Sequence, residues 1–182
     1  SGMRAGKYMT SGLGLAIVLL TACRAPAGDD AAPQRYAPSD LPPAVAETRR
    51  TLLIAAQSGD LDTLRPILAE ADHFRFSYSV EPDPVVYWRD IRARRGGRPI
   101  MRKLAQALAL PAARTDGGGF VWPYLASLPA QAYADLDPET AADVSLLMTR
   151  ARWNESAATV GYTGYRLSIG AEGTWTGFIA GD

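Results

Sequence analysis

The sequence predicts an α+β fold, in which an N-terminal helical hairpin and further helices pack on a small, mainly antiparallel sheet that ends in a C-terminal β-hairpin. Three observations predict this class. Apolar residues recur at helical spacing from residue 45 onward, segments with the alternation of a strand are few and short, and residues 165–180 are typical of two strands joined by a glycine-rich turn.

Two helices are expected to open the domain. Apolar residues recur at helical spacing over residues 45–56, and the Ser-Gly pair at residues 58–59 ends the first helix. Asp60 or Asp62 can cap the second. The stretch IAAQSGDLDTLRPILAEAD (residues 54–72) resembles the helix-turn-helix portion of an ankyrin repeat. No second copy follows at a period of about 33 residues, and a single repeat cannot bury its own face, so a generic αα-hairpin is favoured.

The middle of the chain predicts one strand and then further helices. Residues 73–80 alternate between polar and apolar side chains, which predicts a half-buried strand with Phe74, Phe76, Tyr78 and Val80 on one face. Helices are expected to start near Pro84, near Pro99 and at Asp137-Pro138, and further strands at residues 120–122, 165–169 and 174–180.

The composition limits the chemistry. The 182 residues carry 19 Lys and Arg against 19 Asp and Glu, so no strong field attracts nucleic acid, and we expect no nucleic-acid partner. The one cysteine excludes an internal disulfide and a cysteine-based zinc site. The one histidine, His73, leaves any Ser-His-Asp triad dependent on that residue alone. We therefore expect no metal and no cofactor.

The first residues have the order of a secretion signal. A Ser-Gly pair precedes Met3 and is typical of the remnant of an affinity tag. Arg4 and Lys7 then supply positive charge ahead of the apolar run LGLAIVLL at residues 13–20. A helix that crosses a bilayer needs about 20 apolar residues, so this run is too short to span one. It predicts a signal peptide.

Residues 20–23, with the sequence LTAC, resemble the lipobox of bacterial lipoproteins. The resemblance implies that Cys23 carries a diacylglycerol, that cleavage precedes it, and that its new amine is acylated. Two or more chains give a stable anchor, because each buried methylene contributes about 0.8 kcal/mol. Arg24 is not the aspartate associated with inner-membrane retention, which implies the outer membrane, facing the periplasm. The alternative is an ordinary cleavable signal followed by an incidental cysteine.

Three regions follow from this assignment. Residues 1–22 comprise the tag remnant and the signal peptide. Residues 23–43 begin with the lipidated cysteine and are rich in Ala, Pro and Asp, so they are expected to form a disordered tether. Residues 44–182 are expected to form a single α+β domain, since about 140 residues can bury enough surface for one core.

Three segments together resemble a family of uncharacterised bacterial envelope proteins. They are EPDPVVYW (residues 81–88), FVWPYLA (residues 120–126) and GYRLSIGAEGTWTGFIAGD (residues 164–182), and they span much of the expected domain. The resemblance implies one folded module and brings no assigned activity and no site residue.

Basic residues are concentrated between residues 89 and 103. Arg89 and Arg92 lie near one side of the expected helix and are candidates for binding anions such as lipid headgroups or lipopolysaccharide phosphates. Arg94 falls on the other side, so the run does not form the single stripe that a membrane-surface helix requires. A solvated helix end, paired with acids elsewhere, is the favoured alternative.

Trp122 and Tyr124 are candidates for a groove that binds a sugar or a peptide. Aromatic faces stack on such ligands, Pro123 interrupts the strand, and the glycines at residues 117–119 permit a ligand to approach closely. The alternative is that both rings fill the core. No constellation of nucleophile and base is evident, so we expect no catalytic residue.

These observations favour a lipid-tethered, non-enzymatic module that binds or scaffolds an envelope protein or glycan, and whose membrane contact is its N-terminal lipid. The rival is a small envelope hydrolase or transferase that uses carboxylates, which need no recognisable motif. A cleft that holds desolvated carboxylates would favour the rival. A third class, an assembly or stress-related protein acting through a partner, would show an exposed apolar patch.

Overall fold

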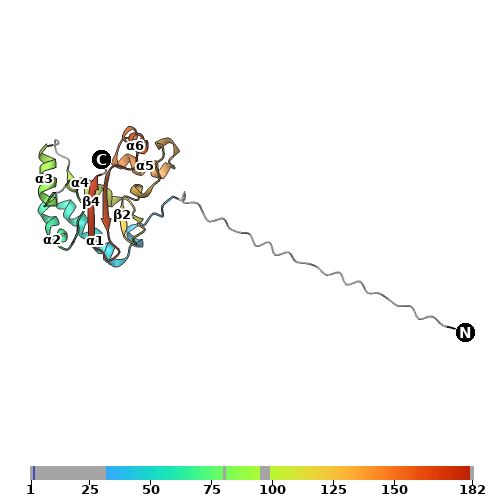
Figure 1. The fold of residues 1–182 in the computed structure, drawn as a ribbon, viewed down its shortest axis with the longest axis horizontal. Coiled ribbons are helices and arrows are strands. Elements are labelled where there is room, and N and C mark those ends of the chain that lie inside the picture. Colours follow the sequence, from blue (N-terminus) through green and yellow to red (C-terminus); the bar gives the residue numbers. More distant parts are fainter. Residues whose placement is uncertain (1, 3–31, 80, 95–98, 181–182) are drawn as a thin grey trace.

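An antiparallel sheet with the strand order β1-β2-β3-β4 lies between the helices (Figure 1). The computed structural model describes Gly2 and residues 32–79, 81–94 and 99–180. The strands are β1 (Ala113–Arg114), β2 (Phe120–Trp122), β3 (Tyr165–Ile169) and β4 (Trp175–Ala180). The α-helices are α1 (Pro43–Ser58), α2 (Arg65–Leu68), α3 (Pro84–Arg94), α4 (Ile100–Ala109), α5 (Pro138–Leu147) and α6 (Arg150–Ala157). The 3₁₀ helices are η1 (Pro38–Asp40), η2 (Leu61–Leu64), η3 (Tyr124–Ser127) and η4 (Tyr133–Asp135). The predicted α+β fold and its closing β3–β4 hairpin are confirmed.

The predicted helical hairpin is present, but its second arm is divided. Helix α1 ends at Gly59, whose φ of 72° is readily adopted only by glycine. Asp60 accepts a hydrogen bond from the N–H of Asp62 at 3.0 Å and so caps η2. Pro66 is tolerated only in the first turn of an α-helix, which explains why α-helical geometry begins no earlier than Arg65.

The strand predicted at residues 73–80 is wrong over the residues that the structure describes. Only Arg75 makes a bridge, in which its N–H donates to the carbonyl of Thr176 at 3.0 Å and its carbonyl accepts from Phe178 at 2.9 Å. Phe74 packs edge-on against the Trp175 ring at 4.5 Å, whereas Tyr78 is 59% exposed. The alternation of polar and apolar residues at 73–79 therefore reflects the packing of Phe74 and Phe76 on the core. These residues do not form the ladder of backbone hydrogen bonds that defines a strand.

The packed part of the chain begins before residue 44. Tyr36 exchanges two backbone hydrogen bonds with Ala112, at 2.8 and 3.0 Å, and its ring lies edge-on to Phe120. Leu41 is buried. Residues 36–41 are polar on average, but Tyr36 and Leu41 pack on the domain and hold this segment against it.

Two hydrophobic clusters form the interior. The first cluster gathers α1, α3, α4 and one face of the sheet, and it includes Trp88, Leu104, Trp122, Leu167, Trp175 and Phe178. The second cluster lies around η3, α5 and α6, and it includes Leu110, Ala113, Tyr124, Leu125, Val144, Trp153 and Tyr162. In Figure 1, α2 and α3 lie at the left edge of the domain, and α5 and α6 lie at its upper right.

Candidate functional site

A cavity of about 280 Å³ lies where the two clusters meet, and we call it the junction cavity. Its wall is formed by α4, by the end of α5, by α6, and by the residues around the start of β3 and the end of β4. The residues that line it are Lys103, Ala107, Leu147, Met148, Arg152, Tyr162, Thr163, Gly164, Tyr165 and Ala180.

Helix α4 contributes Lys103 and Ala107, which are four residues apart and therefore share a helix face. The neighbouring face of the helix is buried through Leu104 and Leu108, both 0% exposed, which fixes the helix against the first cluster. Lys103 is half-buried. Its long aliphatic stem can cover apolar surface while the ammonium group stays at the cavity wall.

Helix α6 places Arg152 in the wall. The Thr149 side chain caps this helix by accepting a hydrogen bond from the N–H of Arg152 at 3.2 Å. The next residue, Trp153, is buried, and its indole N–H donates to the carbonyl of Gln131 at 2.9 Å. One buried ring thus fixes the helix and with it the direction from which Arg152 approaches the cavity.

The loop that leads into β3 is held to α6 by hydroxyl groups. Ser156 donates to the Arg152 carbonyl at 2.9 Å, so its oxygen must accept the 2.6 Å hydrogen bond from Thr163. Tyr162 donates to the carbonyl of Tyr165 at 3.2 Å. A Cβ on Gly164 would overlap the Tyr162 ring, so only glycine permits this packing. Burial raises the pKa of Tyr162, which keeps the phenol neutral.

The wall of the junction cavity is basic and apolar. It contains Lys103 and Arg152 but no carboxylate among its lining residues. The hydroxyls of Thr163 and Tyr162 already donate to protein acceptors, so neither is poised as a nucleophile. Such a wall can attract an anion and enclose an apolar group.

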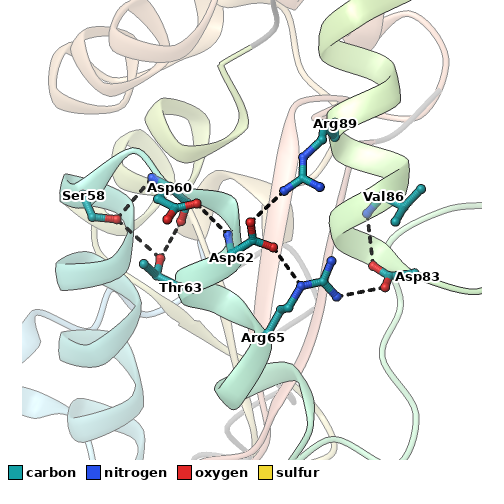
Figure 2. A network of polar contacts seen from close by, with 8 residues as sticks. All are labelled: Ser58, Asp60, Asp62, Thr63, Arg65, Asp83, Val86 and Arg89. Carbon is teal, nitrogen blue, oxygen red and sulfur yellow. Dashed lines mark hydrogen bonds and ion pairs between the residues drawn. The ribbon is translucent and has the colours of Figure 1, made fainter.

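Arg89 belongs to a surface network of ion pairs (Figure 2). Its guanidinium lies 2.9 Å from Asp62, which also accepts from Arg65 at 2.8 Å, and Arg65 lies 2.9 Å from Asp83. Hydrogen bonds from Arg65 lower the pKa of both aspartates. Arg89 therefore joins α3 to the helical hairpin, and its charge is shared with an acid, which corresponds to the favoured alternative for the basic run.

Arg92 lies apart from that network. It lines a second cavity of about 440 Å³ between α1, α3 and α4, together with Trp88, Pro99 and Met101. Residues 95–98 of the basic run lie outside the described residues. The two neighbouring arginines of α3 thus have different surroundings: Arg89 pairs with Asp62, and Arg92 lines this cavity.

Trp122 and Tyr124, proposed from the sequence as groove residues, are each 1% exposed. Trp122 belongs to the first cluster and Tyr124 to the second, so the structure favours the core alternative for both rings. The Arg35 guanidinium lies 4.5 Å from the centre of the Tyr124 ring, and the Tyr124 hydroxyl donates to Asp143 at 2.9 Å. Burial raises the pKa of Tyr124 to about 12.

Most residues of the junction cavity belong to no motif that the sequence predicts. Lys103 is the last member of the basic run, and Arg152 and Tyr162 lie outside every predicted site. The segment GYTGYR at residues 161–166 offered one signal, because closely spaced glycines between tyrosines are typical of tight backbone packing.

Carboxylates in the described residues remain in contact with solvent. Asp83 and Asp143 are half-buried, and the others are exposed. In the same residues, no three His, Cys, Asp or Glu side chains are grouped so as to hold a metal ion, and no helix is long and apolar enough to cross a membrane. Cys23 lies outside the described residues, so its lipidation stays a prediction.

Comparison with protein-family models, with curated proteins and with solved structures finds no match to this chain. The resemblances to bacterial lipoproteins and to an envelope family therefore stay predictions from the sequence.

Proposed function

We propose that the chain is a lipid-anchored, non-enzymatic binding module of the bacterial envelope. The junction cavity is the single observation that carries the binding part of this proposal. Its wall combines cations with apolar side chains, and the hydroxyls of Tyr162 and Thr163 donate to protein acceptors. This combination suits retention of a ligand, whereas hydrolysis or group transfer needs a base or nucleophile beside the ligand.

The rival proposal is an enzyme that uses carboxylates. The burial of the carboxylates distinguishes this proposal from a binding module. A carboxylic acid that acts in proton transfer near neutral pH is desolvated, which raises its pKa. The half-buried Asp83 has the opposite perturbation, because its hydrogen bond with Arg65 lowers the pKa. The ionised form of this carboxylate is therefore stabilised, as suits an ion pair.

The anchoring part of the proposal rests on Cys23. It is the only cysteine in the chain, so a thioether-linked diacylglycerol has one place to form. The experiment expresses the chain in a bacterium that processes lipoproteins, with an alkyne-tagged fatty acid in the medium. We expect the wild-type chain to be labelled and to fractionate with membranes, and Cys23→Ser to lose both properties.

Thr21→Ser serves as the matched control, because it keeps a small hydroxyl residue in the resembling lipobox and should be labelled like the wild type. Equal labelling of Cys23→Ser, or an unlabelled wild-type chain, would contradict the proposed anchor.

A further inference from the structure

We propose that the junction cavity binds a small amphipathic anion: a molecule with a carboxylate or phosphate head and an apolar body of several carbon atoms. This inference rests on the proposed function, since it names the ligand class of the proposed binding module. Three properties of the cavity point to such a ligand: the charges in its wall, its apolar lining and its size.

The charges favour an anionic head. Lys103 and Arg152 reach the wall from different helices, so a head between them would neutralise two cations that the fold brings together. Among the described residues, no acid lies within ion-pair distance of Lys103. Arg152 has Glu155 at 3.4 Å, but both side chains are more than half exposed. A solvent-exposed pair of this kind contributes little, so the guanidinium can exchange Glu155 for a ligand at small cost.

The lining favours an apolar body. Leu147 and Met148 supply aliphatic and thioether surface from the end of α5, and Tyr162 and Tyr165 line the cavity from the β3 side. A methionine side chain adapts to ligands of different shape, because it has several rotatable bonds and a polarizable sulfur. Transfer of an apolar group from water to this surface is favourable in proportion to the apolar area that it buries.

The size of the cavity restricts the body. A volume of about 280 Å³ lies at the lower end of the range of about 300–1,000 Å³ that is usual for small-molecule sites. Ala107 stands in the wall where a larger side chain would fill the space. The cavity therefore suits a short-chain or single-ring acid, and it is too small to enclose a diacyl lipid.

The experiment is isothermal titration calorimetry on the purified full-length chain. Octanoate and octyl phosphate are the two probes with both parts, 1-octanol has the body without the charge, and inorganic phosphate has the charge without the body. We expect octanoate, octyl phosphate or both to bind at micromolar to millimolar concentration, each more tightly than the two partial probes. The preferred head distinguishes a carboxylic acid from a phosphate ester.

Two double variants test the position of the site. Lys103→Gln with Arg152→Gln removes both cations of the wall, and we expect binding to weaken about tenfold or more, since each lost charged contact of about 1.4 kcal/mol is worth a factor of ten. Arg102→Gln with Arg150→Gln is the matched control: it makes the same charge change on the same two helices, at residues outside the lining, and should change affinity by less than about twofold.

Circular dichroism of each variant verifies that the fold is retained. The inference is overturned if neither two-part probe binds, if 1-octanol binds as tightly as the tighter of the two two-part probes, or if the two double variants weaken binding equally. These outcomes leave the acyl labelling of Cys23 unaffected, so failure of this inference is distinguishable from failure of the proposed anchor.

Discussion

The two hydrophobic clusters are built by different means. In the first cluster, the aromatic rings pack mainly on one another: Trp88 lies about 6 Å from the rings of Phe74, Phe76, Trp175 and Phe178. Among the described residues, the indole N–H of Trp88 has no hydrogen-bond partner, although Trp88 is 0% exposed. In the second cluster, Trp153 donates to the carbonyl of Gln131. In the first cluster, the Trp175 indole N–H also donates to a backbone carbonyl, but only to Gly177 of the same strand, at 3.1 Å. The first cluster thus depends mainly on contacts between rings, whereas in the second cluster the Trp153 indole joins segments that are 22 residues apart.

Each cluster borders a cavity: one of about 440 Å³ beside Trp88, and the junction cavity of about 280 Å³ at Tyr162. The closely packed rings of the first cluster support the sheet and α4. The lining at Tyr162 adds hydroxyl-bearing side chains, which the described lining beside Trp88 lacks. The junction cavity lies at the second cluster's Tyr162, against α4, which the first cluster holds in place.

The largest expected effect is in the first cluster. Trp88→Ala removes a fully buried indole from the centre of the aromatic group, and we expect the free energy of unfolding to fall by about 3–5 kcal/mol. Urea unfolding followed by circular dichroism measures this change. A loss below about 1 kcal/mol would show that the first cluster is not the main source of stability.

A smaller effect separates the roles of the two buried indoles. Trp88→Phe and Trp153→Phe remove similar volume, but only the second also removes a hydrogen bond. We expect Trp153→Phe to cost about 1 kcal/mol more than Trp88→Phe, because the Gln131 carbonyl loses its donor. The same urea measurement compares them. An equal cost, or a larger one for Trp88→Phe, would contradict the distinction between the clusters.

The last comparison concerns two arginines, one largely buried and one exposed. Arg35 donates to Thr140 at 2.6 Å, lies 2.7 Å from Glu139 and covers the Tyr124 ring of the second cluster, with its side chain 26% exposed. We expect Arg35→Ala to cost about 1–2 kcal/mol. Arg89→Ala, in the more exposed network of Figure 2, is the control and should cost less, because exposed ion pairs contribute little. The reverse order, again by urea unfolding, would contradict this difference.

Much of the fold was predictable because residues that end or cap helices and form turns lie where the apolar pattern also places the ends of elements. Gly59 ends α1, Asp137 caps α5 by accepting from the N–H of Thr140, and residues 165–180 form the expected hairpin. The prediction of a strand failed at residues 73–79, where side chains are buried but the backbone does not pair as a strand. The aromatic alternation at Phe74 and Phe76 serves packing and not a strand, and the short β1 has no periodicity to detect.

The candidate site was hardly predictable, for a physical reason. Lys103 and Arg152 are far apart in the sequence, and they share a cavity only because Trp153 fixes α6 and Leu104 fixes α4. Trp122 and Tyr124 stood out as functional candidates because large aromatic residues are common both in binding sites and in cores. The arrangement of the helices is needed to show that Lys103 and Arg152 share a cavity and that Trp122 and Tyr124 are core residues.

The central claim is that the chain binds its ligand in the junction cavity. Its most direct test is to follow the backbone amide resonances of the full-length chain by NMR during titration with octanoate. We predict that the largest shifts occur at Thr163, Gly164 and Tyr165 and at the facing residues Lys103 and Met148. Shifts centred instead on the cavity beside Trp88 and Met101, or a spectrum that millimolar octanoate and millimolar octyl phosphate both leave unchanged, would contradict the claim.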